Sequence, residues 1–196
     1  MVSDAQTSPA QPSAAQAEGR RAASMGWYVA YVRPNCERRV AADIARAGYE
    51  TYVATQKVWR QWSDRRKLID KVVITQIIFI RCTLRDTERL ERLSIIYHFL
   101  RIPGTRTKAT IPDEQLANFR AVLTRADEEN VLFTSDKFSK GDPVRIRFGK
   151  FAGVTGIVER EANGAKYLTV VIDYLGSARV KIKAEDLMPL ADGEEE

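Results

Sequence analysis

The chain has 196 residues, of which 44% are hydrophobic and 29% are charged, a composition that allows one core of ordinary size or two small ones. Its longest apolar run, residues 72–80, is interrupted by polar side chains and is far shorter than the roughly 20 residues of a membrane-spanning helix. The net charge of +5 favours acidic partners only moderately, because 26 acidic residues are interleaved with 31 basic ones. Two cysteines and one histidine cannot supply a structural zinc site, so we expect no metal or cofactor, and the unpaired thiols suit a reducing cytoplasm.

The first strand is predicted at "WYVAYVRP", which begins at Trp27, because aromatic and β-branched residues are followed there by a proline. Asn35 is expected to cap the helix that follows. Val40 and Ile44 fall on the apolar face of this helix, and Gly48 ends it.

Residues 49–83 are mainly β in pattern, with two long runs around the polar turn "SDRRK", and they predict one extended hairpin. A second helix is expected over residues 86–96, with Asp86 as its N-cap, before the strand "YHFLRI". A third helix starts at Pro112. This order, β-α-β-β-α-β plus a helix, predicts an α/β sandwich.

The C-terminal part shows five short alternating strands separated by glycines, a pattern typical of a small β-barrel. The predicted fold class is therefore α+β, a sandwich followed by a barrel. The expected organisation is a disordered tail at 1–24, the sandwich domain at 25–127, a linker at 128–137, the barrel at 138–190 and an acidic tail at 191–196.

Six basic residues surround Trp59 and Trp62 between Lys57 and Lys71, against two aspartates. Cationic side chains bind phosphates and indoles stack on unpaired bases, so this segment predicts a nucleic-acid contact. The alternative is a solvated hairpin whose tryptophans turn inward. The residues that we expect to contact nucleic acid are Arg33, Arg38, Arg39, Lys57, Arg60, Arg65, Arg66 and Lys67.

Residues 140–160 resemble the KOW motif, in which two strands flank a glycine-centred loop, although a generic SH3-like barrel is the alternative. The matching residues are Val144, Ile146, Gly149, Phe151, Gly153, Gly156 and Val158. Gly149, Phe151, Gly153 and Gly156 form the expected KOW turn. Gly153 and Gly156 are expected to adopt positive φ in this turn, and Phe151 is expected to fill the barrel.

The segment "WYVAYVRPNCERRVAADIARAGYETYV" resembles the start of the NusG N-terminal domain, so that the resemblance spans residues 25–190. Within this family, "QKVWRQWSDRRKLIDKVVI" and "YHFLRIPG" are most similar to the specialised UpxY-type regulators of capsular polysaccharide operons, with RfaH a more distant relative. One departure lies at residues 74–77, which read Ile-Thr-Gln-Ile where the family often has Phe-Pro-Gly-Tyr.

The resemblance implies a non-enzymatic transcription elongation or antitermination factor that keeps RNA polymerase processive, on particular operons. It implies docking on the clamp helices of the largest polymerase subunit, and Tyr31, Ile74 and Ile77 are the candidates for that apolar patch. Ordinary sheet core is the alternative for the two isoleucines. It also implies contact with non-template or upstream DNA, a barrel that recruits a ribosomal protein or termination factor, and a companion inhibitor. We expect a monomer whose barrel does not refold as helices.

Two other functions are conceivable for such a sequence. An enzyme lacks support, because His98 stands alone and "GKFAGVTG" does not have the residue order of a phosphate-binding loop. A ribosome-associated or general RNA-binding KOW protein is the remaining alternative, for which the basic charge would serve folded RNA.

Overall fold

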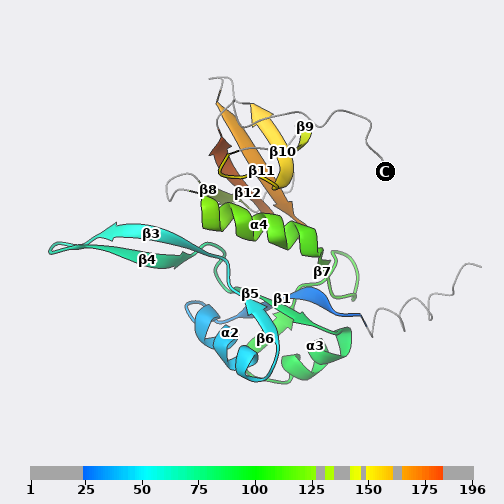
Figure 1. Cartoon of the computed structure of the whole chain (residues 1–196). Helices are drawn as coiled ribbons and strands as arrows, with labels where there is room; N and C mark the ends of the chain where they lie inside the picture. Colours follow the sequence, from blue (N-terminus) through cyan, green and yellow to red (C-terminus); the bar gives the residue numbers. More distant parts are fainter. Residues whose placement is uncertain (1–23, 127–130, 135–141, 147–148, 161–164, 183–196) are drawn as a thin grey trace, which may run out of the picture.

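The computed structural model describes residues 24–126, 131–134, 142–146, 149–160 and 165–182. The predicted tails, apart from Ser24, lie outside this part of the chain, as does most of the predicted linker. The described residues form a mixed α/β structure with three helices and several sheets (Figure 1), which confirms the mixed α/β fold. The helices are α2 (Glu37–Arg46), α3 (Leu84–Glu91) and α4 (Asp113–Arg125).

The described residues form three sheets. The first has the strand order β2-β5-β1-β6, with β7 paired to β1, and the last has the order β8-β12-β11-β10-β9. The third sheet is inserted in sequence between β2 and β5 of the first: among the described residues, β3 (Thr55–Gln61) and β4 (Arg66–Val72) pair only with each other. The other strands are β1 (Gly26–Val32), β2 (Glu50–Tyr52), β5 (Ile77–Cys82), β6 (Ile96–Phe99), β7 (Thr110–Ile111), β8 (Val131–Thr134), β9 (Asp142–Arg145), β10 (Thr155–Arg160), β11 (Lys166–Ile172) and β12 (Gly176–Ile182).

The first sheet is covered on both faces, because alternate residues of a strand point to opposite sides. Tyr28, Ala30 and Val32 pack in one cluster with the apolar residues of α2 and α3, whereas Trp27 and Val29 join the cluster that contains α4. We call this sheet with α2 and α3 the sandwich. In Figure 1, α4 lies between the sandwich and the second five-stranded sheet. Apolar residues of the sandwich, of α4 and of the second five-stranded sheet all belong to the cluster that contains Trp27 and Val29.

The predicted start of the first helix is wrong. Asn35 has a positive φ of 61° and lies in the turn before the helix, so Cys36 takes the N-cap position without a side-chain hydrogen bond. Val40 and Ile44 are buried as expected from their spacing. The apolar pattern therefore predicted the position of the helix correctly, whereas the predicted N-cap residue was wrong.

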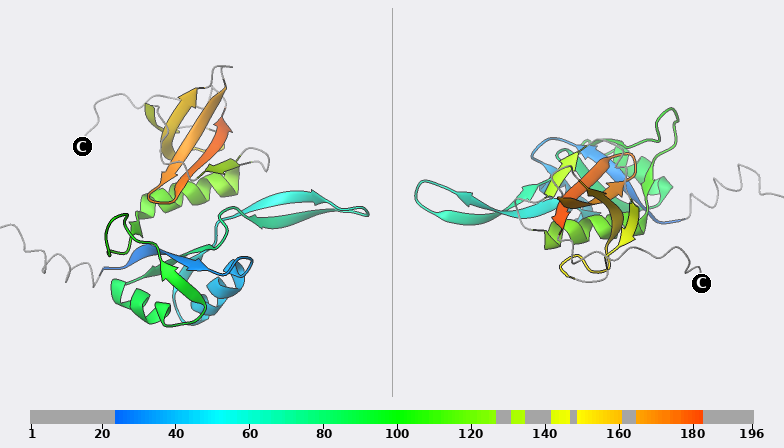
Figure 2. Two further views of the ribbon diagram at one scale, coloured as in Figure 1. Left: turned by 180° about the vertical axis from the view of Figure 1, so that it is seen from behind. Right: turned by 90° about the horizontal axis from the view of Figure 1, so that it is seen from above.

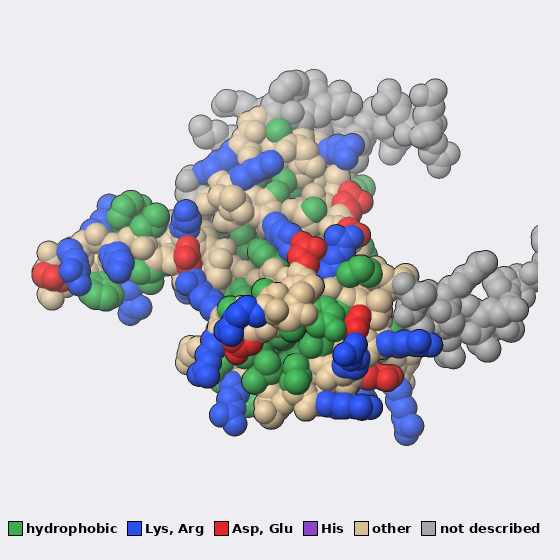
Figure 3. All heavy atoms as spheres, turned by 60° about the horizontal axis from the view of Figure 1, so that its bottom comes forward, with side chains coloured by type: hydrophobic (Ala, Val, Ile, Leu, Met, Phe, Trp, Pro, Cys, Tyr) green, Lys and Arg blue, Asp and Glu red, His purple; other side chains and the backbone are tan. Residues whose placement is uncertain are grey.

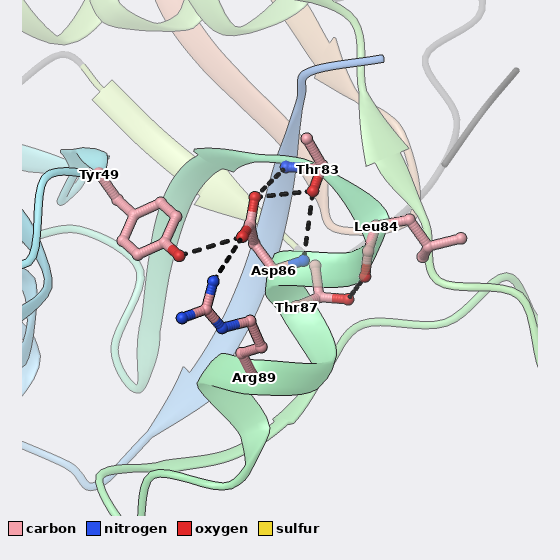
Figure 4. A network of polar contacts seen from close by, with 6 residues as sticks. All are labelled: Tyr49, Thr83, Leu84, Asp86, Thr87 and Arg89. Atoms are coloured by element: carbon pink, nitrogen blue, oxygen red, sulfur yellow. Dashed lines mark hydrogen bonds and ion pairs between the residues drawn. The ribbon is translucent and has the colours of Figure 1, made fainter. Parts of the chain in front are cut away.

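The second helix begins two residues before Asp86, which is not its N-cap. Thr83 is the N-cap: its hydroxyl accepts the Asp86 N–H at 3.2 Å, and the Asp86 carboxylate accepts the Thr83 N–H at 3.1 Å (Figure 4). Hydrogen bonds from the Thr83 side chain, with others from the Thr83 backbone and Tyr49, hold the pKa of Asp86 below its ordinary value although burial opposes this. The helix ends at Glu91, so Leu93 lies outside it and is exposed.

The predicted extended hairpin is divided at its base. β2 and β5 join the first sheet, while β3 and β4 leave it as a separate arm. The division falls at a turn where Gln76 adopts a φ of 65°, a conformation that interrupts a regular strand.

The segment expected to be a linker contains β8, which pairs antiparallel with β12 from Val131 to Thr134. The backbone groups of this strand therefore complete the edge of the second sheet. Gly153 has the expected positive φ of 85°, but Gly156 lies within β10 and is not among the glycines with positive φ. A Cβ at Gly156 would lie 2.6 Å from the Thr169 carbonyl oxygen, so the requirement there is space for a close strand.

Candidate functional site

The β3–β4 hairpin extends away from the rest of the protein as an arm (Figure 2). Its pairing is regular from Thr55 opposite Val72 to Gln61 opposite Arg66. At the tip, the Trp62 N–H donates to the Arg65 carbonyl at 2.8 Å. An isolated two-stranded hairpin is marginally stable in water, so the direction of this arm depends on how its base is attached.

Hydrogen bonds at the base of the arm join its two strands and connect it to α2. The Val73 N–H donates to the carbonyl of Ala54, which is fully buried, at 2.8 Å. The Arg38 guanidinium on α2 donates to the Asp70 carbonyl at 2.5 Å and lies 3.6 Å from the Asp70 carboxylate. Arg38 was predicted to contact nucleic acid, but here it holds the arm against α2.

Both tryptophans of the arm reach the solvent. Trp59 is 49% exposed and Trp62 is 44% exposed, so the alternative in which they turn inward is wrong. The Arg66 guanidinium carbon lies 5.0 Å from the Trp59 ring centroid, and that of Arg65 lies 5.6 Å from the Trp62 ring centroid. These distances fit cation–π contacts, which orient the cations beside the rings.

The eight basic residues predicted to contact nucleic acid are all exposed. Figure 3 shows Lys and Arg side chains interspersed with hydrophobic ones on the arm, and more Lys and Arg side chains next to its base. Arg33 precedes α2 and Arg39 lies on it, so these two belong to the sandwich rather than to the arm. The eight residues therefore fall into two groups, five on the arm and three on or next to α2.

The three candidates for the apolar patch lie close together. Tyr31 is directly opposite Ile77 in the pairing of β1 with β5, and Ile74 precedes β5 by three residues. Their surroundings differ, because Ile74 and Ile77 are only 7% and 6% exposed in the cluster that includes α4, whereas Tyr31 is partly exposed. In this conformation the isoleucines are core residues, as the alternative held, and Tyr31 alone reaches the surface.

Tyr31 borders an open hollow of about 470 Å³ that is also lined by His98, Phe99, Leu100 and Arg101. The rings of Tyr31 and His98 lie with centroids 4.6 Å apart. Burial raises the pKa of the Tyr31 hydroxyl above its ordinary value. The hollow offers a partner an aromatic wall with a neutral hydroxyl.

Sequence reasoning missed Glu37, which was assigned only to the first turn of α2. Its carboxylate is 2% exposed and accepts the Gln76 N–H at 2.6 Å, while the Gln76 carbonyl accepts the Val32 N–H at 2.9 Å. These bonds hold Gln76 at positive φ, a conformation that glycine adopts more readily than other residues. The departure at residues 74–77 was the available signal, since a non-glycine residue there needs an external partner.

Helix α4 makes polar contacts with the second sheet region. The Gln115 side-chain oxygen accepts the Asp173 N–H at 3.0 Å, and the Arg125 guanidinium donates to the Ala152 carbonyl at 2.8 Å. Asn118 exchanges hydrogen bonds with Thr155. Among the residues of the expected KOW turn, Gly153 has the expected positive φ, Gly149 also has a positive φ, and Phe151 is buried as expected.

These features place the chain among mixed α/β proteins that combine a helix-covered sheet with a projecting basic arm. Among the described residues, no helix is both long and apolar enough to cross a membrane. Within the same residues, no group of three or more His, Cys, Asp or Glu side chains could hold a metal ion.

Comparison with known proteins relates the first part of the chain to a known family. Residues 25–120 match the family described as "Transcription termination factor nusG", so this part of the chain is similar to that family. Proteins of this family are non-enzymatic transcription factors that bind RNA polymerase. A solved structure described as "Domain interaction in Thermotoga maritima NusG" is similar with 14% identity and a TM-score of 0.44, over 84% of this chain and 97% of that one. No curated protein matches the sequence.

Proposed function

We propose that the protein is a transcription elongation or antitermination factor that binds RNA polymerase and keeps it processive. The observation that carries the proposal is the similarity of residues 25–120 to the NusG family. Such a factor needs no catalytic group, because a protein that binds the elongating conformation more tightly than the paused one shifts the population by that difference in affinity alone.

The proposed polymerase surface is centred on Tyr31 and faces the clamp helices of the largest subunit. The hollow beside Tyr31 supports this assignment, since aromatic side chains in a recess often dominate binding energy. Ile74 and Ile77 lie next to Tyr31 but are buried, so their direct contact with the polymerase requires a movement of the residues that cover them. Without that movement they support Tyr31 from the core.

The arm is the proposed contact with non-template or upstream DNA, together with Arg33 and Arg39 beside its base. Its exposed indoles and guanidinium groups support this assignment, because such groups bind exposed bases and phosphates. Arg38 contributes by holding the arm in position.

The finer parts of the proposal concern specialisation. The resemblance of the arm to UpxY-type regulators supports an operon-specific role in capsular or exopolysaccharide genes, with a companion inhibitor. The second sheet is proposed as a KOW barrel that recruits a ribosomal protein or termination factor. The buried Phe151 and the positive φ of Gly149 and Gly153 support that assignment. We propose that the factor acts as a monomer in the cytoplasm.

Transcription with purified RNA polymerase tests the proposal. The wild-type chain is expected to shorten pauses, and Tyr31→Ala is expected to raise the half-maximal concentration about tenfold, as for an interface residue of high energetic weight. Tyr97→Ala is the matched control, because Tyr97 is an exposed tyrosine on β6 that does not line the hollow. Unchanged pausing at saturating wild-type protein would refute the proposal.

A ribosome-associated or RNA-binding role is the second candidate, because exposed basic side chains on the arm also suit folded RNA. Recovery of bound complexes on the tagged chain separates the two functions. RNA polymerase among the bound proteins supports the transcription factor, whereas ribosomal subunits without polymerase support the alternative.

A further inference from the structure

The two faces of the arm differ in chemistry, which follows from its register. Directly opposed residues share a face, and the face alternates along each strand. One face, which we call the Trp59 face, carries Lys57, Trp59 and Gln61 with their partners Asp70, Leu68 and Arg66. The other, which we call the Arg60 face, carries Gln56, Val58 and Arg60 with their partners Lys71, Ile69 and Lys67.

The tip extends the Arg60 face. Trp62 follows Arg60 by two residues, Arg65 precedes Lys67 by two, and the backbone bond between Trp62 and Arg65 continues the pairing. The cation–π contact between these two side chains agrees with their common face. Each tryptophan of the arm therefore lies on a different face, with its own arginine.

Positive charge is concentrated on the Arg60 face. This face and its tip carry four cations, and neither strand places an acidic residue on this face. The cations are Arg60, Arg65, Lys67 and Lys71. The Trp59 face has two cations and Asp70, which also lies beside Arg38. Asp64 in the turn lies 3.8 Å from Arg65, but both groups are well exposed and such pairs are weak.

The spacing of the cations suits a phosphate backbone. Arg60 lies opposite Lys67, Arg65 lies two residues before Lys67 and Lys71 lies four residues after it, so at about 3.4 Å per residue the cations form an uneven row with gaps of about 7 and 14 Å. Such a row can neutralise several phosphates of one strand and release their counterions.

Trp62 indicates that the nucleic acid is unpaired. Arg65 lies over its ring, yet the side chain is still 44% exposed at the free end of the arm. Stacking on an indole needs a base whose own face is available, and single strands offer such bases at little cost. On the other face, Trp59 lies opposite Leu68 and under Arg66, on a face that carries only two cations and also Asp70.

We propose that the arm binds single-stranded nucleic acid on its Arg60 face only. Phosphates lie along Arg60, Lys67 and Lys71, and a base stacks on Trp62. The Trp59 face does not contact the strand. This inference deepens the proposed function, because it names the face of the arm and the class of nucleic acid that it takes.

Two charge-matched double variants of the full-length chain test the choice of face. Arg60→Gln with Lys67→Gln removes two charges from the Arg60 face, and Lys57→Gln with Arg66→Gln removes two from the Trp59 face. The probes are labelled single-stranded DNA and RNA of about 12 nucleotides and a DNA duplex of the same length, with affinity measured by fluorescence anisotropy at several salt concentrations.

The first double variant is expected to weaken single-strand binding about tenfold or more and to reduce the salt slope by about 1.4, the value for two lost phosphate contacts. The second is expected to change affinity less than about threefold, since only its long-range charge is lost. Equal losses in both variants would overturn the choice of face. Tighter binding of the duplex than of either single strand would overturn the choice of an unpaired ligand, and the two single strands distinguish DNA from RNA.

Substitution of the tryptophans tests the stacking step. Trp62→Ala is expected to lower affinity about tenfold and to remove most of the fluorescence quenching caused by the oligonucleotide, whereas Trp59→Ala should retain both. The third tryptophan, Trp27, is buried and serves as an internal reference. Quenching that depends on Trp59 instead would contradict the proposal.

Polymerase binding measured on the same variants separates this inference from the proposed function. If the wild-type chain binds single strands through the Arg60 face but does not bind polymerase, the proposed function fails and the inference stands. If both double variants bind polymerase normally but lose oligonucleotide affinity equally, the inference fails alone.

Discussion

The central strands of the sandwich and the strands of the arm are neighbours in sequence, yet their environments are opposite. All residues of β5 except Arg81 are buried, while most residues of β3 and β4 are exposed. Both segments have the aromatic and β-branched residues that favour strands. The difference shows that strand propensity selects the backbone conformation, whereas helices packed on both faces decide which strands form the core.

Because of this contrast, we expect different residues to determine the stability of the protein and its affinity for partners. The sandwich buries apolar side chains between helices, so substitutions there should lower the free energy of unfolding. The arm contributes little buried surface, so substitutions there should change affinity for partners and leave unfolding nearly unchanged. Tyr31 lies at the boundary between the two, since it belongs to a core strand and reaches the surface.

The largest effect is expected from Phe79→Ala. Phe79 is fully buried on β5, and removal of its ring should lower the free energy of unfolding by about 3–5 kcal/mol. Trp59→Ala, the aromatic control on the arm, should change it by less than about 1 kcal/mol. Urea unfolding followed by circular dichroism measures both values, and similar losses in the two variants would remove the contrast.

Glu37→Ala should have the next largest effect, because it removes the buried carboxylate that accepts the Gln76 N–H. The expected loss is about 1–3 kcal/mol. Glu37→Gln retains a side-chain oxygen as acceptor and should lose less. Thermal unfolding compares the two variants, and an equal loss would show that the charge of Glu37 matters rather than its hydrogen bond.

Thr83→Ala should cost about 1 kcal/mol, the usual value for an N-cap, and Thr83→Ser should restore most of it. The cap also predicts a pH dependence. The pKa of Asp86 is lowered in the folded state, so its contribution is present above the ordinary pKa of an aspartate, about 3.9, and is lost as pH falls further. The stability difference between wild type and Asp86→Asn should therefore shrink in unfolding measured below about pH 4. A difference that grows on acidification would contradict the assignment.

Arg38→Ala should have the smallest effect on unfolding, below about 0.5 kcal/mol, because its ion pair with Asp70 is exposed. Its expected effect is local: amide hydrogens of β4 should exchange faster as the base of the arm loosens. Arg39→Ala, at the neighbouring position on α2, should leave that exchange unchanged. Equal exchange in both variants would mean that Arg38 does not position the arm.

The sequence was sufficient for the elements that are set by periodic apolar residues. The first strand, the helix that buries Val40 and Ile44, and the helix after Pro112 lie within a few residues of their predicted positions. Helix starts were less predictable, because Thr83 and Asp86 both have capping side chains and only their reciprocal hydrogen bonds show which one is the N-cap.

The candidate sites depended on information that the sequence does not contain. The basic residues of the arm were found from composition, but their division between two faces follows from the register that begins with Thr55 opposite Val72. Burial of Ile74 and Ile77 depends on packing in a cluster that also contains α4, which is distant in sequence. Glu37 acquired its role only through a turn 39 residues away.

The most direct test of the account is the affinity of the labelled full-length chain for reconstituted elongation complexes of RNA polymerase, measured by equilibrium titration. The account predicts saturable binding that is weakened by Tyr31→Ala and unaffected by Tyr97→Ala. An absence of measurable binding by a correctly folded wild-type chain would contradict it.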